Sequence, residues 1–391
     1  MFNGGFMLLS ALVSLIYKDG VTFQIFLAGI ITLLVGVVSM VFTRRHKKEI
    51  NKREGYIVVS FGWVIMSLSG TLPYVLTESI PSFTNAFFET MSGYTTTGAS
   101  ILNDIEAVPK GILFWRSLTH WIGGMGIIVL AIAILPLLGI GGMQLFAAEA
   151  PGPSADKLHP RITDTAKRLW IIYFGYTAAE TLLLSVAGMS FFDAINHSMS
   201  NIASGGFSTK DSSLAYWNSI PIIQYIVIFF MFIAGTNFIL LYYVFKGKFN
   251  KIKLDEEFNL YLRFILAFSL VVGLIVFFNS NFLVSDDISL FSRIEGVIRH
   301  SLFQVVSIVT TTGFVTADYT SWTPFLLLIF FLTYSFNGAA HMAHYNKFNK
   351  IEMEILRDGE VIGYNYYFFK KDADNTTVTN QLKFTVKLFG A

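Results

Sequence analysis

The chain has no cysteine among its 391 residues, and only 14% of its residues carry a charge. Without cysteine the protein forms neither disulfides nor thiolate metal sites, although this leaves the redox compartment open. What is abundant instead is apolar: 53% of the residues are hydrophobic, 39 are phenylalanine, and the mean hydropathy is +0.57. No soluble domain needs so much apolar surface. The composition predicts an α-helical membrane protein, and the net charge of +2 says little about partners.

Long apolar runs recur along the chain and reach or approach the roughly 20 residues that cross a bilayer core. They occupy residues 23–42, 56–76, 112–140, 169–187, 220–245 and 258–278. The first apolar run, at residues 6–17, is too short to span comfortably. These runs predict an all-α protein that crosses the membrane several times.

Basic residues gather in four connections, at residues 43–53, 157–168, 245–253 and 344–350. An excess of Lys and Arg marks the cytoplasmic side of a membrane protein. We therefore expect these connections to be cytoplasmic. The connections rich in Thr, Ser and Gly then face outside, unless they dip back into the membrane.

Three stretches of the sequence can be superimposed on a single glycine. They read "ETMSGYTTTGAS" around Gly98, "HSMSNIASGGFST" around Gly206 and "QVVSIVTTTGFVT" around Gly313, at spacings of 108 and 107 residues. A serine stands six residues before each glycine and a hydroxyl two residues before it: Ser92, Ser200 and Ser307, then Thr96, Ser204 and Thr311. Each stretch overlaps the end of a predicted short helix, at 84–93, 192–202 and 294–309. The repeated unit is a span, a short helix, a glycine-centred loop and a second span.

This arrangement predicts a cation path. Irregular backbone at membrane depth persists only where it is buried in protein or lines a watery path. A helix that ends at such a loop directs its negative dipole end there, and loop carbonyls can replace an ion's hydration shell. We expect backbone carbonyls and hydroxyls at nine positions to coordinate a dehydrated monovalent cation: Thr96, Thr97, Gly98, Ser204, Gly205, Gly206, Thr311, Thr312 and Gly313.

Several motifs in order resemble a known family. They are "SGYTTTGAS", "WIGGMGIIVLAIAILPLLGIGGMQLFAAEAPGP", "HPRITDTAKRLW", "ASGGFSTKD", "AGTNF" and "FQVVSIVTTTGF", within residues 6–333. The chain resembles the ion-conducting membrane subunit of the Trk/Ktr/HKT superfamily of potassium transporters, most closely the bacterial TrkH type. The resemblance implies a pseudo-fourfold pore of four units, with potassium (K⁺) as the transported ion and no covalently bound cofactor. Glycine at all three filter centres is what the resemblance associates with K⁺ over Na⁺.

The resemblance also implies a setting: the bacterial cytoplasmic (inner) membrane, contact with lipid, a homodimer, and a cytosolic regulatory subunit that binds nucleotides. No nucleic-acid partner is expected. The expected division is a leading helix pair and basic loop at 1–55, pore unit 1 at 56–150, pore unit 2 at 151–250 and pore unit 3 at 251–350. A divergent tail at 351–391 stands where the family has its fourth unit, so the sequence is expected to be C-terminally incomplete. The family's glycine-rich gate loop is not recognisable near residues 334–350, and "NQLKFTVKLF" is at most a short β segment or a disordered tail.

Alternatives to potassium uptake stay open at this point. One is a non-conducting remnant, truncated or frameshifted, and another is a Na⁺-permeable or other monovalent-cation transporter. An enzyme would need a clustered nucleophile, an acid–base pair or a metal set, and the sequence offers none. A carrier of larger solutes would normally consist of two inverted halves rather than three parallel copies.

Individual polar and small residues have competing interpretations. The glycines Gly123, Gly124 and Gly126 are interpreted as helix packing. His197 falls at the repeat position of Glu89 and Gln304, which favours a polar brace over a metal ligand. Charges at Arg116 and Asp193 are either functional or extend to the outer surface. Asn237 either lines an inner vestibule or forms an interhelical hydrogen bond.

Overall fold

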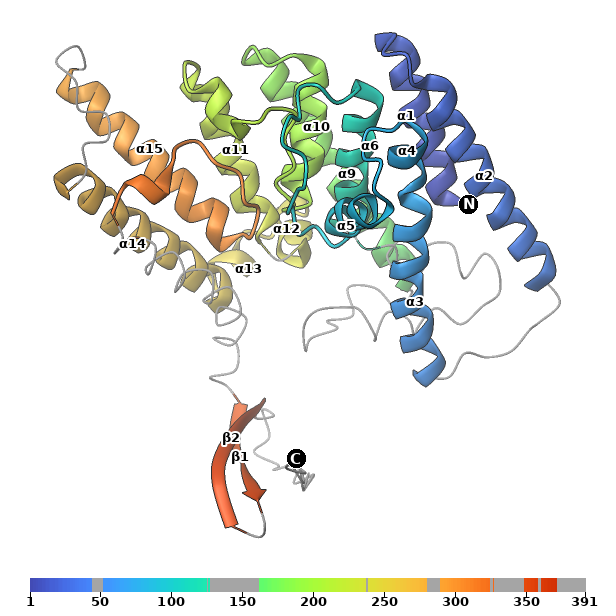
Figure 1. Ribbon diagram of the computed structural model, residues 1–391. Helices are drawn as coiled ribbons and strands as arrows, with labels where there is room; N and C mark the ends of the chain where they lie inside the picture. The colour runs from blue at the N-terminus through green and yellow to red at the C-terminus, as the bar shows by residue number, and fades with distance from the viewer. Residues whose placement is uncertain are drawn as a thin grey trace.

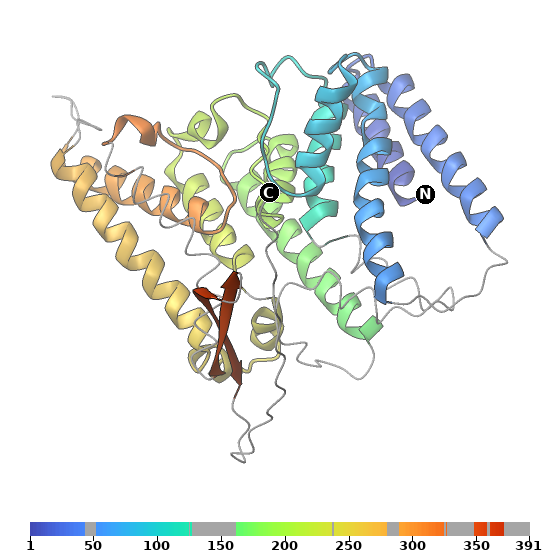
Figure 2. The ribbon, with the colours of Figure 1, turned by 60° about the horizontal axis from the view of Figure 1, so that its bottom comes forward.

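A computed structural model describes residues 1–43, 52–124, 126, 162–236, 238–279, 289–323, 326, 348–357 and 360–370. Its helices follow one another across the molecule in chain order, from the N-terminal pair to α15 (Figure 1). The same order is visible when the molecule is turned (Figure 2). The expectations for Asn237, for the gate loop at 334–347 and for the strand-like end of the chain fall outside the described residues.

The chain begins with a helical hairpin, α1 (Phe2–Tyr17) and α2 (Thr22–Thr43). The two helices approach closely at Gly4, where an added Cβ would lie 2.7 Å from the carbonyl oxygen of Gly29. Small residues permit this kind of contact between membrane helices. Helix α1 also packs against α6, so the hairpin is attached to the first repeat.

Three successive stretches after the hairpin each contain a longer helix followed by α5, α10 or α15, the helices that lead into the glycine loops. The first stretch contains α3 (Lys52–Gly70), α4 (Leu72–Leu76), α5 (Phe83–Tyr94) and α6 (Lys110–Gly124). The second contains α9 (Ile162–Val186), α10 (Phe191–Ile202), η2 (Ser213–Trp217), α11 (Pro221–Ala234) and α12 (Phe238–Phe245). The third contains α13 (Asn250–Lys253), α14 (Glu256–Asn279), α15 (Leu290–Val309) and η3 (Tyr319–Ser321). The exact division of the chain into pore units remains a prediction.

Three helical stretches of the described residues are long and apolar enough to cross a membrane: Thr22–Thr43, Arg168–Val186 and Phe258–Phe278. They coincide with predicted apolar runs. The run at 220–245, in contrast, is not one continuous helix, because α11 ends at Gly235 and α12 begins at Phe238. An added Cβ on Gly235 would lie 2.6 Å from Oη of Tyr261 and 2.7 Å from Cγ2 of Thr310. The helical run is thus interrupted after α11, where Thr310 at the end of α15 packs against it.

Two of the predicted short helices lie where expected, within one residue at each end, as α5 and α10. The third, α15, begins at Leu290, about a turn before the predicted start. Its start is fixed by Ser289, whose Oγ accepts a hydrogen bond from the Ser292 N–H at 3.2 Å. Ser190 caps α10 in the same way, accepting from the Asp193 N–H.

The all-α prediction is wrong for one described segment. Residues Phe348–Arg357 (β1) and Glu360–Lys370 (β2) form a two-stranded antiparallel hairpin that pairs Phe348 with Lys370. The register shifts between Ile355 and Leu356, as at a β-bulge. Strict alternation in "KIEMEI" and the aromatic-rich "YNYYFF" favour strands over helices, and both lie before the segment where we expected strand character.

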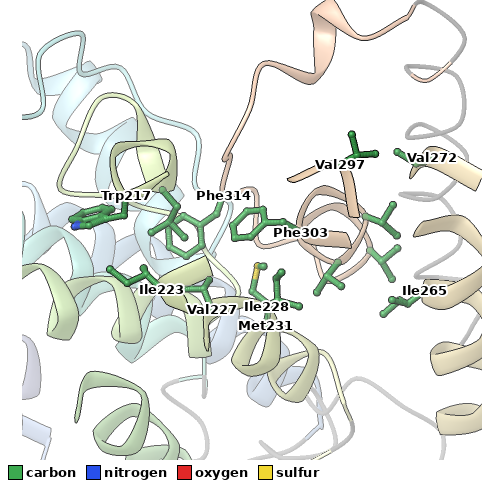
Figure 3. Packing of buried hydrophobic residues seen from close by; sticks show 14 of the residues in the cluster. Trp217, Ile223, Val227, Ile228, Met231, Ile265, Val272, Val297, Phe303 and Phe314 are labelled. Atoms are coloured by element: carbon green, nitrogen blue, oxygen red, sulfur yellow. The ribbon is translucent and has the colours of Figure 1, made fainter. Parts of the chain in front are cut away.

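A large apolar core lies between the second and third repeats. Phe303 of α15 and Phe314 of the following loop are both fully buried there, and their rings lie next to each other between α11 and α15 (Figure 3). Val227 and Met231 of α11 complete this contact from the other side. The loop after α15 is therefore anchored by its own aromatic residue, which directly follows Gly313.

The glycines of α6 act as close-packing residues. An added Cβ on Gly123 would overlap the carbonyl oxygen of Tyr94, at the end of α5. On Gly124 it would lie 2.7 Å from Cα of Ala203, which follows α10. Helix α6 thus lies against the ends of both short helices, and the prediction of helix packing is confirmed at these two positions.

The variant Gly123→Ala should therefore lower the melting temperature of the purified protein in detergent. Overlap with a backbone oxygen cannot be relieved by a rotamer change, and overpacking of this kind costs about 1–3 kcal/mol. The matched control is Gly175→Ala, because Gly175 is also helical but an added Cβ meets no atom within 4 Å. Equal melting temperatures for the two variants would contradict the close packing of α6.

Candidate functional site

The three short helices end in the same backbone conformation. Their C-cap residues Thr95, Ala203 and Thr310 have φ angles of −79°, −80° and −82°. The N–H two residues after each cap then donates to the carbonyl at the position six residues before the repeat glycine. These hydrogen bonds run from Thr97 to Ser92 at 2.9 Å, from Gly205 to Ser200 at 2.8 Å and from Thr312 to Ser307 at 2.9 Å. Each helix thus ends in a Schellman motif, which reverses the chain.

A Schellman motif places the residue after the cap in the left-handed region, where glycine is usual. Here that residue carries a hydroxyl: the φ angles are +54° at Thr96, +54° at Ser204 and +60° at Thr311. Two residues later the repeat glycines also have positive φ: +75° at Gly98, +78° at Gly206 and +80° at Gly313. Both the glycines and the hydroxyl positions were found from the sequence. The strained backbone at the hydroxyl residues becomes visible only in the structure.

The turn leaves the loop carbonyls without partners. The loop N–H groups are directed back to the helix, while none of the carbonyl oxygens at the nine predicted positions accepts a hydrogen bond within the described part of the chain. Of the nine residues only Gly205 and Thr312 are buried, and the others are half-buried or exposed, so their carbonyls are accessible from the space beside the loops. Three adjacent loops with free carbonyls therefore form a site suited to a cation.

Threonine hydroxyls in two of the loops hold the loop backbone to the preceding helix. In the first loop Thr97 contacts the hydroxyl of Thr95 at 2.8 Å, and in the third Thr312 contacts Thr310 at the same distance. Thr95 and Thr310 in turn donate to carbonyls one helical turn earlier. These hydroxyls hold the loop to its helix, so the carbonyls are the better candidate ligands.

The second loop is supported by the imidazole ring of His120, where the first and third loops are supported by threonine hydroxyls. It has Ala203 and Gly205 at the equivalent positions, and the imidazole of His120 fills the space beside Gly205. That ring stacks on Phe207 with a centroid distance of 3.8 Å, and its Nδ1 lies 3.2 Å from the Ser200 hydroxyl. His120 comes from α6, so this support crosses from the first repeat to the second.

The loops contact one another in a regular succession. An added Cβ on Gly98 would overlap the carbonyl oxygen of Gly205, and one on Gly206 would overlap the carbonyl oxygen of Thr312. Each glycine therefore lies against the residue that precedes the next glycine in the repeat. No described atom lies within 4 Å of an added Cβ on Gly313. This neighbour relation places the first loop beside the second and the second beside the third, while the assignment of all nine residues to one cation site stays a prediction.

A buried ion pair joins the first and second loops. Arg116 Nε lies 2.6 Å from Glu89 Oε1, and both side chains are at most 3% exposed. Glu89 also accepts from Ser100 and from the Ile101 N–H, just after the first loop. Arg116 donates to the Ser208 carbonyl at 3.0 Å, just after the second. The expectation that Arg116 extends to the outer surface is wrong, because Glu89 and the second loop hold it inside.

His197 occupies the position of Glu89 one repeat later and braces its own loop. Its Nε2 lies 3.0 Å from the Ser208 hydroxyl, and its Nδ1 lies 2.8 Å from the Asp193 carbonyl. Like Glu89 and Ser100, His197 and Ser208 are 11 residues apart, a spacing that was readable in the sequence. Asp193 is half-buried and accepts from Thr209 at 2.6 Å, so it too braces the segment after the second loop.

The segments that follow the three loops in the chain are also joined to one another. The Ala215 N–H donates to the Val315 carbonyl at 3.1 Å, linking the second and third repeats. Nearer the surface, Lys210 of the second repeat lies 2.8 Å from Glu106 of the first. This hydrogen bond with Glu106 raises the pKa of Lys210 above its ordinary value. The three loops thus share one connected support.

Comparison with known proteins agrees with this geometry. The TrkH family profile, described as a cation transport protein, matches residues 21–345. The Trk system potassium uptake protein TrkH of Salmonella typhimurium is 41% identical over 339 residues, which cover 86% of this chain and 68% of that protein. The crystal structure of the potassium transporter TrkH from Vibrio parahaemolyticus matches with a TM-score of 0.71 and 37% identity, covering 84% of this chain and 66% of the other.

Fold, site and comparisons define a helical membrane protein of the cation-transporting class, not an enzyme. The chain belongs to the TrkH family of cation transport proteins. It spans about two thirds of the length of the relatives that it matches.

Neutralising Glu89 should destabilise the protein strongly, because Arg116 would remain as a buried charge without its partner. We expect Glu89→Gln to lower the free energy of unfolding by about 3–5 kcal/mol, measured by denaturation in detergent. The double variant Glu89→Gln/Arg116→Met should lose less than the two single variants added together. The control is Glu106→Gln in the exposed pair with Lys210, for which about 1 kcal/mol or less is expected. A loss at Glu89 no larger than at Glu106 would contradict the buried brace.

Proposed function

We propose that the chain takes up potassium through a filter formed by the backbone carbonyls of its three loops. The observation that carries this proposal is the row of unpaired carbonyls at Thr96–Gly98, Ser204–Gly206 and Thr311–Gly313, next to the C-terminal ends of α5, α10 and α15. Helix C-termini carry partial negative charge, and carbonyl oxygens replace the hydration shell of a dehydrated cation. The names of the curated relatives, potassium uptake proteins, support K⁺ as the ion.

The arrangement favours a short filter over a long one with several sites. Each loop turns only once between its helix and its glycine, which leaves a few carbonyls per loop. We therefore expect K⁺ to be preferred over Na⁺ by a modest factor. The neighbour relation from Gly98 to Gly205 and from Gly206 to Thr312 is that of successive units around one axis. This relation supports the proposed pseudo-fourfold pore.

The remaining proposals concern the setting of the pore. We place the protein in the bacterial cytoplasmic membrane with its basic connections inside and its filter loops toward the outside, by the Lys and Arg bias. We further propose a homodimer that works with a cytosolic nucleotide-binding regulatory subunit. The names of the relatives, which assign them to a Trk system, support a multi-component assembly.

Changing Gly206 to alanine should abolish potassium uptake. A Cβ there would overlap the Thr312 carbonyl oxygen, and the backbone at φ +78° disfavours any other residue. The measurement is rubidium-86 uptake in a bacterial strain without its own potassium importers, with membrane expression verified for each variant.

The matched control is Gly247→Ala. Gly247 has a similar φ of +67°, but an added Cβ meets nothing within 4 Å, so it tests backbone strain without the filter contact. Uptake should persist in this control. Normal uptake by Gly206→Ala would contradict the filter assignment. Loss of uptake in both variants would attribute the effect to backbone strain at positive φ and not to the filter contact. Competition by excess Na⁺ in the same assay separates K⁺ uptake from a Na⁺-permeable path.

A further inference from the structure

A buried acid lies directly behind the second loop. Glu180 of α9 and Asn201 of α10 are both fully buried, and Nδ2 of Asn201 donates to Oε1 of Glu180 at 2.6 Å. The same Nδ2 donates to the Val227 carbonyl of α11 at 3.3 Å. One asparagine therefore links three helices around the end of the second short helix. Glu180 lies within the Arg168–Val186 stretch that can cross a membrane.

Hydrogen-bond accounting shows that a donor is missing from this contact. Both N–H bonds of the Asn201 amide are used. What remains is Oε2 of Glu180 and Oδ1 of Asn201, two buried acceptors for which the described residues supply no donor. A carboxylate and an amide oxygen cannot satisfy each other, because neither carries a hydrogen. Buried acceptors left in this state are costly.

One proton satisfies both atoms. A hydrogen on Oε2 would donate to Oδ1 while Nδ2 donates to Oε1, which gives the two parallel hydrogen bonds of an acid–amide pair. An ionised carboxylate at this place would instead need a buried cation to offset its desolvation. The polar group that contacts Glu180 in the described residues is the neutral Asn201.

Within the described residues, no titratable group near Glu180 supplies that cation, since Arg168 of α9 lies 12 residues, more than three turns, before it. Tyr173 and Tyr176 precede Glu180 by seven and four residues along α9, and both are ordinarily neutral. On α10, His197 lies one turn before Asn201, and its two ring nitrogens contact the Asp193 carbonyl and the Ser208 hydroxyl. On α11 the contact is the backbone carbonyl of Val227.

The pair lies where it can set the position of the loop. The carbonyl of Asn201 accepts the Ser204 N–H at 2.8 Å, within the Schellman motif that opens the second loop. The side chain and the backbone of Asn201 thus connect Glu180 to the loop.

The other two repeats have no asparagine at this position. Gly93 stands at the equivalent position in the first repeat, where an added Cβ would overlap the Thr119 hydroxyl, and Ile308 stands there in the third.

We propose that Glu180 is a neutral carboxylic acid whose proton is held by Oδ1 of Asn201, and that this acid–amide pair positions the second filter loop. The role in positioning rests on the filter proposed above, whereas the protonation of Glu180 does not.

The protonation is tested by infrared spectroscopy on the whole protein in lipid. The wild type should show the carbonyl stretch of a protonated, hydrogen-bonded carboxylic acid at neutral pH, and Glu180→Gln should lose that band. Absence of the band from the wild type, or its persistence in Glu180→Gln, would overturn the assignment. Because this readout needs no transport, it remains informative even if the chain takes up no potassium.

The positioning role is tested by rubidium-86 uptake. Glutamine keeps one acceptor and one donor in the same places, so Glu180→Gln should keep the wild-type rate, whereas Glu180→Ala should lower it by about tenfold or more. The swap Glu180→Gln/Asn201→Asp exchanges acid and amide at unchanged side-chain lengths. It should restore the infrared band that Glu180→Gln loses and keep uptake near the wild-type rate, which provides a second variant if a single one folds poorly. Wild-type uptake by Glu180→Ala, or loss of uptake in Glu180→Gln and the swap at normal expression, would refute the role.

Discussion

The site depends on how three short helices end. In a Schellman motif the N–H groups of the two residues after the cap donate backward to carbonyls of the helix's last turn, so the loop spends its own donors on the helix. The carbonyls of the following residues are then left without donors. At the ends of α5, α10 and α15 this occurs three times with nearly the same dihedral angles. The proposed cation site would therefore be a consequence of backbone hydrogen bonding, with side chains holding the loops in place.

Strain explains why so many contacts surround these loops. Thr96, Ser204 and Thr311 adopt a left-handed conformation that costs a non-glycine residue of the order of 1–3 kcal/mol, and such a residue persists only when its surroundings determine it. The surroundings here are the buried pair of Glu89 and Arg116, the stacked ring of His120 and the aromatic residues that follow the second and third glycines. Most of these contacts join one repeat to the next. The loops are consequently held as a set rather than one by one.

The sequence predicted the repeat well and its supports poorly, for a physical reason. Glycines at a fixed spacing are visible because positive φ restricts the residue type, and the short helices before them follow from local periodicity. Arg116, in contrast, pairs with Glu89 across 27 residues and with Ser208 across 92, which no local pattern encodes. The sequence therefore left two interpretations of Arg116 open, a functional charge or an extension to the outer surface, and did not identify Glu89 as its partner. Glu180 was missed similarly, since its partner Asn201 lies on another helix. The β1–β2 hairpin was missed because the resemblance to a helical family outweighed clear alternation in the sequence.

The three loops combine one backbone geometry with three different supports. In the first and third, pairs of threonine hydroxyls hold the loop to its helix, while in the second the ring of His120 and the contact between Glu180 and Asn201 take their place. A cation coordinated by carbonyls requires equal positions of those carbonyls but not equal side chains behind them. On the proposed filter, each repeat can reach the same backbone conformation through its own packing. This explains why three stretches that match in φ angles differ so much in the residues around them.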